Sequence, residues 1–353
     1  MHELGDLMLM DWIIIKEPLL NWYRDNHREL PWRNTDNPYH IWISEIMLQQ
    51  TRVEAVKGYY QRFLDRLPDI QSLCLISEDE LLKLWEGLGY YNRARNLQKA
   101  AKVIMEQYHG EFPKEYEEVV SLPGIGEYTA GAICSICFNQ STPAVDGNVL
   151  RVMTRIAKWD AIIDLAKTKT QAKDELMKLY AQGNCNELTQ ALMELGATVC
   201  VPNGVPNCEA CPLRGVCQAY TEQDYLSYPK RAPKRKRKIY EKTVFVLHNE
   251  DCFGIRQRPD SGVLANMWEF YHTDGYMDKQ EALDFISEKG FGPILLEKEI
   301  PYTHIFTHME WKMTAYFIAC TKMLSDLTWV TKEELESKYA LPTAFKMFLD
   351  KEH

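Results

Sequence analysis

SLPGIGEYTAGAICSICFNQSTPAVDGNVLRV, residues 121–152, is the stretch from which the rest of the chain is interpreted. Its turn contains Gly124 and Gly126, which lack a Cβ, so both can adopt positive φ and let backbone N–H groups approach a bound group. A helix is expected directly afterwards, over residues 127–139. The N–H groups at its start and their partial positive charge predict an anion site for one phosphate of a nucleic-acid backbone. An ordinary corner between two helices is the alternative for the turn taken alone.

The composition is that of a globular protein with room for two domains. The chain has 353 residues, 46% of them hydrophobic, and no run of 18 apolar residues. The first 20 residues are apolar but interrupted by charges and lack a basic leader, which predicts a helix and a protein that stays inside the cell, in the cytoplasm, with no membrane partner. A net charge of -9 argues against a generally basic coat for nucleic acid, although local patches decide binding.

Four of the 10 cysteines are clustered as Cys200-x7-Cys208-x2-Cys211-x5-Cys217. Without a secretion signal, such thiols are expected to be reduced or to bind metal. Zinc sites usually show two short cysteine pairs separated by a dozen or more residues, whereas this loop has one such pair flanked closely on both sides. The spacing favours a 4Fe–4S cluster, with zinc as the alternative.

Glu45 is a candidate acid on a helix expected from Tyr39 to about Tyr60. A carboxyl in apolar surroundings keeps its proton to higher pH, as a general acid requires. A helix acid that reaches into solvent is the alternative. The residues three and four positions away place Glu45 on the apolar stripe: Ile41, Trp42, Leu48 and Gln49.

A second glycine-containing loop, residues 84–95, joins two expected helices and carries adjacent tyrosines, Tyr90 and Tyr91. Aromatic side chains in such a loop can insert between bases. The alternative is that both tyrosines pack on the core while Arg93 and Arg95 stay solvated.

The composition changes at YLSYPKRAPKRKRKIY, residues 225–240, which predicts a basic interdomain linker that could lie along DNA. A nuclear-import signal and a solvated spacer are the alternatives. Strands are then expected at residues 243–248 and 314–320, and a helix at residues 279–289, which together predict an α+β domain.

Two motifs resemble known families. LPGIGEYTAGAI followed by AVDGNVLRV resembles the helix-hairpin-helix and Gly/Pro-Asp signature of base-excision DNA glycosylases. PYHIWISEIMLQQTRV is similar to a helix of the adenine DNA glycosylases of the MutY family. The resemblance implies a multidomain fold: an all-α helix-hairpin-helix core over residues 1–224, built as a six-helix barrel and an iron–sulfur cluster lobe, and an α+β Nudix-like lesion-recognition domain over residues 241–353. The cluster loop is then 200–217 and the linker 225–240.

The resemblance also implies a function, a monofunctional glycosylase that acts as a monomer with one 4Fe–4S cluster. Its partner is double-stranded DNA in which adenine is mispaired with 8-oxoguanine or guanine; the enzyme flips out that adenine and hydrolyses its N-glycosidic bond, leaving an abasic site. Glu45 would protonate the adenine, Asp146 would stabilise the cationic sugar, and Tyr128 and Asn148 would orient them. Enzymes of the superfamily that also cut the backbone have a lysine where this chain has Tyr128.

Further residues follow from the same resemblance. The adenine pocket is expected from Arg28, Trp32, Leu48 and Gln190. DNA contacts are expected from Gln49, Gln50, Tyr90, Leu122, Gly124 and Gly126. The cluster ligands are expected to be Cys200, Cys208, Cys211 and Cys217.

The C-terminal domain resembles the opening of a Nudix fold at residues 254–270, but the acid-rich magnesium-binding helix is absent from the sequence that follows. The family reads 8-oxoguanine through a Phe-Ser-His loop, which here is Phe306, Thr307 and His308, so Thr307 keeps the hydroxyl and adds a methyl group. Three alternatives stay open: a bifunctional glycosylase and lyase of the endonuclease III type, a Nudix pyrophosphohydrolase, and a non-catalytic DNA-binding protein.

Overall fold

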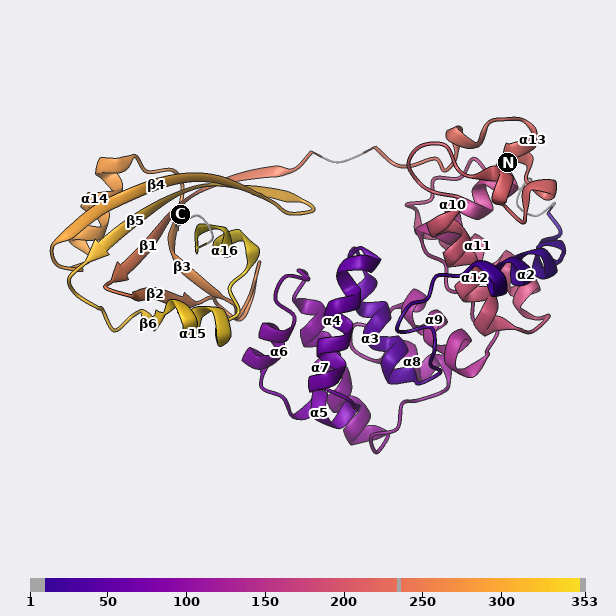
Figure 1. The fold of residues 1–353 in the computed structure, drawn as a ribbon, viewed down its shortest axis with the longest axis horizontal. Coiled ribbons are helices and arrows are strands. Elements are labelled where there is room, and N and C mark those ends of the chain that lie inside the picture. Colours follow the sequence, from indigo (N-terminus) through magenta and orange to yellow (C-terminus); the bar gives the residue numbers. More distant parts are fainter. Residues whose placement is uncertain (1–9, 234–235, 350–353) are drawn as a thin grey trace. The chain divides into compact units, whose positions relative to one another are not determined.

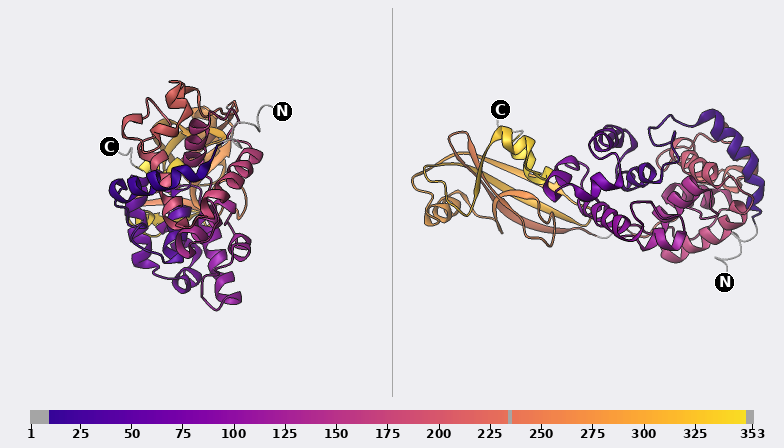
Figure 2. Two further views of the ribbon diagram at one scale, coloured as in Figure 1. Left: turned by 90° about the vertical axis from the view of Figure 1, so that its right-hand side faces the viewer. Right: turned by 90° about the horizontal axis from the view of Figure 1, so that it is seen from below.

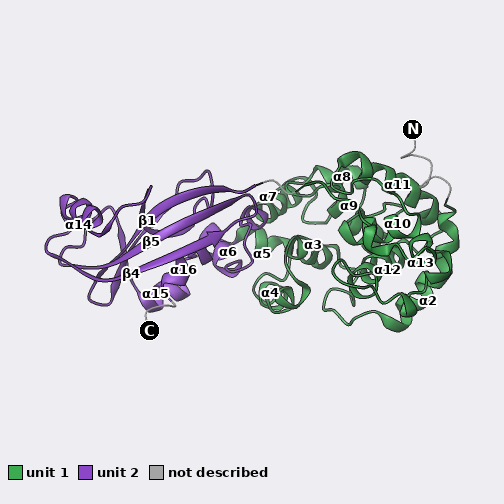
Figure 3. Ribbon diagram, turned by 90° about the horizontal axis from the view of Figure 1, so that it is seen from above, with its two compact units in different colours: residues 1–75, 96–233 green, residues 76–95, 234–353 purple. Residues whose placement is uncertain are grey.

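The computed structural model describes residues 10–233 and 236–349. The chain forms two compact units, of which the first contains residues 1–75 and 96–233 and the second contains residues 76–95 and 234–353 (Figure 3). The short segment 76–95 therefore belongs with the C-terminal part of the chain, although it precedes most of the helices of the first unit. The expected division at residues 224 and 241 stays a prediction.

The first unit is helical, as predicted (Figure 1). Buried apolar side chains on α3 and α9 meet where these helices pack together, and α3 also packs on α4, α9 also on α8. The helices of this unit are η1 (Trp12–Ile15), α2 (Lys16–Asn26), α3 (Pro38–Leu48), α4 (Val53–Arg66), α5 (Ile70–Leu75), α7 (Asn92–Gln107, whose first turn lies in the other unit), α8 (Tyr116–Ser121), α9 (Glu127–Phe138), α10 (Gly147–Ile156), α11 (Ala166–Tyr180), α12 (Cys185–Thr198), η2 (Cys208–Ala210), η3 (Arg214–Val216), α13 (Gln218–Thr221) and η4 (Tyr225–Ser227).

The turn between α8 and α9 is the expected hairpin. Gly124 has φ +77°, and a Cβ there would lie 2.5 Å from the Cβ of Asn96, so only glycine fits. Gly126 has φ -96° and begins α9 as its N-cap, so the expectation of positive φ was right for Gly124 and wrong for Gly126. Among the described residues, apart from its two chain neighbours, no atom lies within 4 Å of where a Cβ of Gly126 would be, so this side of its backbone is open.

The single helix expected from Tyr39 to Tyr60 was wrong, because α3 ends at Leu48 and α4 begins at Val53. Gln50 adopts φ +58°, which a helix cannot contain. The break coincides with a polar run, Gln49 to Thr51, that interrupts the apolar stripe, and the Thr51 N–H donates to the Leu48 carbonyl at 3.3 Å in a tight turn. The two glutamines therefore lie in a turn rather than on a helix face.

A second part of the helical unit has its own apolar core, made by α2, α10, α11 and α12. Trp12, Trp159 and Tyr180 are almost fully buried in it, and Cys200, Cys211 and Cys217 pack against its edge. Residues 1–9 of the expected N-terminal helix lie outside the described residues, and the part that is described begins with η1 and α2.

The C-terminal unit is the predicted α+β domain, a mixed sheet in the order β4-β5-β1-β3-β2-β6. The β1–β5 pair is parallel and the others are antiparallel. Helix α14 covers one face of the sheet and α15 and α16 cover the other (Figure 2). The elements are α6 (Glu78–Leu84), β1 (Lys238–Asn249), β2 (Cys252–Gln257), β3 (Trp268–Asp274), α14 (Lys279–Glu288), β4 (Ile294–Ile305), β5 (Met309–Cys320), β6 (Thr328–Thr331), α15 (Lys332–Ser337) and α16 (Thr343–Leu349).

The basic segment is more structured than a linker alone. Its last residues, from Lys238, already form β1. Upstream, Arg231 pairs with Asp164 at 3.1 Å, and the Lys230 carbonyl accepts from Ile163 N at 3.1 Å. Within the described ranges, no helix has the length and apolar character needed to cross a bilayer.

Candidate active site

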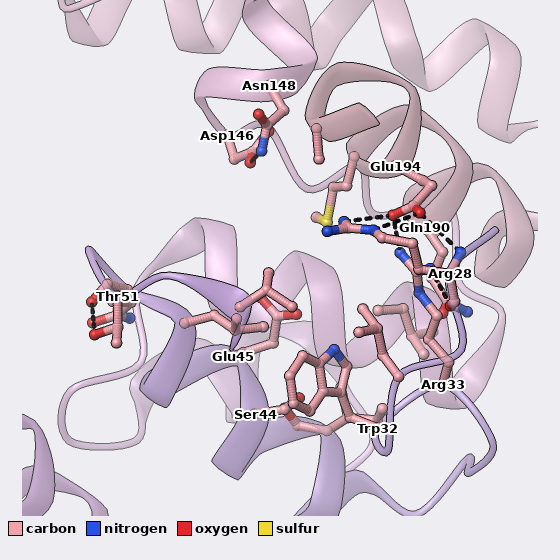
Figure 4. A pocket seen from close by; sticks show the side chains of 18 of the residues that line it. Arg28, Trp32, Arg33, Ser44, Glu45, Thr51, Asp146, Asn148, Gln190 and Glu194 are labelled. Carbon is pink, nitrogen blue, oxygen red and sulfur yellow. Dashed lines mark hydrogen bonds and ion pairs between the residues drawn. The ribbon is translucent and has the colours of Figure 1, made fainter. Parts of the chain in front are cut away.

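A cavity of about 360 Å³ in the helical unit gathers all the predicted catalytic and pocket residues. Figure 4 shows Asp146 and Asn148 on one wall, Glu45 across from them, and Arg28, Gln190 and Glu194 together at another side. The cavity thus brings together residues from α3, α9, α10, α12 and the segment before α3. Ten predicted residues line it: Arg28, Trp32, Glu45, Leu48, Gln49, Gln50, Tyr128, Asp146, Asn148 and Gln190.

Glu45 lies on α3 with its side chain among apolar neighbours, and the residue is 6% exposed. Burial raises the pKa of Glu45 to about 7, and the charge of Asp146 acts in the same direction, while a hydrogen bond from Tyr128 opposes both. Tyr128 Oη donates to Glu45 Oε2 at 2.8 Å. Burial also raises the pKa of Tyr128 well above its ordinary value, so the phenol keeps its proton and remains a donor. Glu45 therefore keeps its proton up to near neutral pH, as a general acid requires.

Asp146, the second residue of the VDGN motif, is the N-cap of α10, a position at which aspartate is favoured. Its Oδ1 accepts from Val149 N at 2.8 Å and its Oδ2 accepts from Asn148 Nδ2 at 2.6 Å. Burial raises the pKa of Asp146, and these hydrogen bonds oppose the shift because they stabilise the carboxylate. The helix start also favours negative charge there. Glu45 and Asp146 thus differ: Glu45 accepts a hydrogen bond from a phenol, whereas Asp146 caps α10 and accepts hydrogen bonds from Val149 N and Asn148 Nδ2.

Sequence reasoning missed a buried ion-pair cluster around Glu194 and Arg33. The side chain of Glu194 has no exposed surface. It accepts from Arg28 N at 2.9 Å, Arg28 Nε at 2.8 Å and Arg28 Nη2 at 2.8 Å, and also from Arg33 Nη2. Burial by itself would raise the pKa of Glu194, but the hydrogen bonds from both arginines outweigh it and lower the pKa to about 2. A signal was present, since Glu194 follows Gln190 by one helical turn on the same face of α12.

Behind Asn148, a buried arginine joins the catalytic wall to α12. Arg151 Nη2 donates to Asn148 Oδ1 at 2.8 Å and to the Gly196 carbonyl at 2.7 Å, and its Nε donates to the Cys200 carbonyl at 2.7 Å. The approach of the two helices depends on Gly196, because a Cβ there would lie 2.6 Å from the Cβ of Asn148. Asn148 is therefore fixed from both sides.

The four clustered cysteines line one small cavity. Its other walls are apolar, and the buried Arg155 donates from Nη1 to Cys200 Sγ at 3.2 Å. All four thiols are free, and burial raises the pKa of Cys211 to about 12. Across the described part of the chain, no three or more His, Cys, Asp or Glu side chains are arranged to hold a metal ion. The cysteines converge, but the ligand set is not preformed.

Comparison with known proteins places the chain in a family. Residues 43–182 match the family of HhH-GPD superfamily base excision DNA repair proteins, and residues 243–351 match the NUDIX domain. The chain is 33% identical over 296 residues to the adenine DNA glycosylase of Buchnera aphidicola, covering 84% of this chain and 83% of the relative. Over an alignment of 394 positions, gaps included, it is 32% identical to the adenine DNA glycosylase of Homo sapiens, covering 93% of this chain and 72% of the relative. The chain belongs to the adenine DNA glycosylases.

Solved structures give the same fold for the helical unit of this adenine DNA glycosylase. A thermostable thymine-DNA glycosylase superposes with a TM-score of 0.53 at 27% identity, covering 59% of this chain and 96% of that one. A trapped endonuclease III–DNA covalent intermediate superposes with a TM-score of 0.51 at 24% identity, covering 62% and 98%. The predicted fold class, a helix-hairpin-helix glycosylase core followed by a Nudix-like domain, is confirmed.

The remaining predicted residues of this adenine DNA glycosylase lie outside the cavity. Leu122, Gly124 and Gly126 form the hairpin turn, with Leu122 buried. In the other unit, Tyr90 is 46% exposed whereas Tyr91 is buried, so the two tyrosines separate into a surface and a core residue. The loop predicted to read 8-oxoguanine, Phe306, Thr307 and His308, is the tip of the β4–β5 hairpin, and Thr307 Oγ1 is hydrogen bonded to Tyr90 Oη.

Proposed function

We propose that this protein excises adenine paired with 8-oxoguanine, or with guanine, from double-stranded DNA. As an adenine DNA glycosylase it is a monofunctional hydrolase of N-glycosidic bonds in base-excision repair. The observation that carries the catalytic assignment is the buried Glu45, with a pKa of about 7, held by Tyr128 in the same cavity as Asp146. Excision leaves an abasic site and an intact backbone. We also propose a monomer in the cytoplasm of a bacterial-type cell.

Breaking an N-glycosidic bond leaves negative charge on the departing base and positive charge on the sugar. Glu45 supplies a proton to the adenine, which makes it a better leaving group. Asp146, capping α10 and bonded by Asn148, places a carboxylate where the sugar carbon becomes positive. Tyr128 holds the Glu45 carboxyl in position. A flipped-out base would exclude water from the cavity, and the lower dielectric would strengthen each of these interactions.

Adenine itself would bind at the end of the cavity formed by Arg28, Trp32, Leu48 and Gln190. Trp32 is 6% exposed and meets Tyr60 edge to face at 5.4 Å, which fixes its ring as one wall. Gln190 Oε1 accepts from Tyr23 Oη at 3.1 Å and its Nε2 donates to the Asn186 carbonyl at 3.3 Å. A flat aromatic wall with an oriented amide suits a planar base that both donates and accepts hydrogen bonds.

The base opposite adenine would be read by Thr307 at the β4–β5 tip, with Phe306 and His308. Phe306 packs on Trp311 with ring centroids 4.8 Å apart, and its N–H donates to the Met309 carbonyl at 2.9 Å. The tip is thereby held while the Thr307 hydroxyl stays at the surface. Gln49, Gln50 and Tyr90 would occupy the duplex near the vacated position, and the α8–α9 turn would bind one phosphate.

The residues around the four cysteines fit a 4Fe–4S cluster. Four thiols face one apolar cavity, and Arg155 donates to one of the sulfurs, a contact that stabilises thiolate charge. A bound cluster would cross-link residues 200–217 through Cys200, Cys208, Cys211 and Cys217. We assign it a structural role, in which it fixes the loop that accepts Arg151 and Arg155 hydrogen bonds. Four iron atoms per chain and a brown protein are expected, whereas one zinc and no colour would contradict this assignment.

A labelled duplex containing adenine opposite 8-oxoguanine tests the function. Incubation followed by alkali should break the strand at the adenine, while incubation without alkali should not. Breaks without alkali would indicate a lyase and contradict the assignment of Tyr128, where a lyase has an amine nucleophile. Binding without breaks under either condition would indicate a non-catalytic DNA-binding protein. Equal excision opposite thymine would contradict recognition of the opposite base.

A further inference from the structure

Residues 76–95 lie within the helical unit in chain order, but they pack with the C-terminal unit. The segment lies between α5 and most of α7, which belong to the helical unit, yet it is part of the C-terminal unit. It contains α6 and the turn that carries Tyr90. The contacts that hold this segment on the C-terminal unit are polar and specific.

The first set of contacts centres on Lys83, at the end of α6. Its Nζ lies 2.6 Å from Glu86 Oε2 and donates to the Tyr339 carbonyl at 3.0 Å and to the Leu335 carbonyl at 3.4 Å. These carbonyls lie at and just beyond the end of α15, where a cation is favoured. Glu86 Oε1 also pairs with Lys346 of α16 at 3.2 Å. The side chains of Lys83 and Glu86 are only 18% and 11% exposed, so solvent screens their pairing weakly.

A second set lies at the two ends of the segment. Glu78 Oε1 accepts from Asn266 Nδ2 at 2.9 Å and from Arg95 Nε at 2.7 Å. Arg95 also donates to the Ala265 carbonyl. Both ends of the segment therefore meet one loop of the C-terminal unit, while its middle meets α15 and α16.

The turn between these contacts is held in an unusual conformation. Gly87 and Gly89 have φ +98° and +69°, and Tyr90 has φ +49°, which is costly for a residue with a side chain. Trp85 Nε1 donates to the Gly89 carbonyl at 3.1 Å, and Arg93 Nη2 donates to the Leu88 and Gly89 carbonyls at 3.0 and 3.1 Å. These bonds keep the ring of Tyr90 exposed, with its hydroxyl on Thr307.

We propose that Lys83, Glu86 and Lys346 form a latch of positioning residues that sets the specificity for 8-oxoguanine by keeping Tyr90 and Thr307 in one fixed arrangement. This inference rests on the proposed function, because it concerns how 8-oxoguanine is distinguished from guanine. A loosened segment must be ordered again each time the hairpin tip engages the lesion. Excision opposite 8-oxoguanine loses more from this than excision opposite guanine, which has no lesion for the tip to engage.

The test compares single-turnover excision of adenine opposite 8-oxoguanine and opposite guanine. In Lys83→Met, which keeps the stem and removes the donors, the ratio of the two rates should fall about tenfold. In Lys346→Glu, whose side chain is partly exposed, it should fall about two- to fivefold. Lys346→Arg should keep the ratio, as should the matched control Lys338→Glu, because Lys338 pairs at 2.8 Å only with Glu334 of its own helix among the ion pairs of the described residues.

Amide hydrogen exchange of the DNA-free full chain supplies the second readout. Exchange over residues 78–91 should rise in Lys83→Met and Lys346→Glu and stay unchanged in Lys338→Glu. Faster exchange with an unchanged ratio would overturn the specificity role, and unchanged exchange would overturn the latch itself. If the unaltered protein excises adenine equally opposite both bases, the proposed lesion reading fails and the specificity role fails with it, while exchange still reports whether the segment is held.

Discussion

Glu45 and Glu194 line one cavity and both are buried, yet the net shifts of their pKa values are opposite. Glu45 receives one hydrogen bond, from a neutral phenol, and its pKa rises to about 7. Glu194 receives hydrogen bonds from two guanidinium groups, and its pKa falls to about 2. Burial acts to raise both pKa values, so the charge of the partner decides which carboxyl is an acid and which is an anion.

The opposite pKa shifts indicate different roles for Glu45 and Glu194. In the proposed function, Glu45 exchanges a proton, whereas Glu194 holds the guanidinium of Arg28 in a fixed orientation. Substituting each glutamate by glutamine keeps the shape and removes the possibility of ionisation. We expect the substitution at Glu45 to reduce activity and the substitution at Glu194 to reduce stability.

Glu45→Gln should have the largest effect on activity. Because the proton donor is lost, single-turnover excision should fall about 10²- to 10⁴-fold. Stability should not fall, since a raised pKa means that ionised Glu45 disfavours folding as pH rises, and glutamine removes that cost. DNA affinity, measured on the same duplex, should be retained. Wild-type rates in this variant would show that Glu45 is not the acid.

Glu194→Gln should affect stability more than chemistry. The buried Arg33 would lose the charge that compensates its burial, at a cost of roughly 3–5 kcal/mol in the free energy of unfolding, while the partly exposed Arg28 adds little. Since the folded pKa is depressed, the stabilisation by Glu194 is present above the unfolded value of about 4.3 and is lost as pH falls towards 2. Urea denaturation at pH 7 and pH 3 measures both. A loss of similar size at both pH values would contradict the ion-pair account.

Gly196→Ala tests the opposite wall, where Asn148 orients Asp146. The added methyl group overlaps the Asn148 Cβ, so the expected cost is about 1–3 kcal/mol in stability. Excision should also slow because Asn148 is displaced, while the pKa of Glu45 should change little. Gly215→Ala is the control, since in the part of the chain that the structure describes no residue other than its chain neighbours lies within 4 Å of the new methyl group. Equal effects of the two substitutions would mean that the α10–α12 approach is not what positions Asn148.

The sequence predicted those features of the site that depend on neighbouring residues and missed those that depend on packing between distant parts of the chain. The burial of Glu45 follows from its helical neighbours, which are local. The approach of Asp146 to Glu45 depends on α10 packing on α12, α12 on α9 and α9 on α3, so it came from the family resemblance and not from periodicity. The break at Gln49–Thr51 was missed because the apolar pattern resumes in α4 and hides the interruption. The Glu194 cluster was missed because its partners, Arg28 and Arg33, are more than 160 residues distant.

In the C-terminal unit, the strands were predicted, whereas the packing of residues 76–95 with this unit was not. The strands expected at residues 243–248 and 314–320 are confirmed as parts of β1 and β5, although burial there is nearly continuous rather than alternating. The grouping of residues 76–95 with that unit depends on Lys83 reaching carbonyls more than 250 residues away, which no local pattern records.

The smallest expected change is also the most direct test of the central claim, that a buried, protonated Glu45 is the acid. Single-turnover excision should decline as pH rises through about 7, since only protonated Glu45 donates. Tyr128 stabilises the carboxylate, so Tyr128→Phe should raise the pKa of Glu45 and move this decline to higher pH. We therefore would measure the pH–rate profile of both proteins. A decline near pH 7 that moves upward in Tyr128→Phe would support the account, whereas a flat profile, or a decline that Tyr128→Phe does not move, would contradict it.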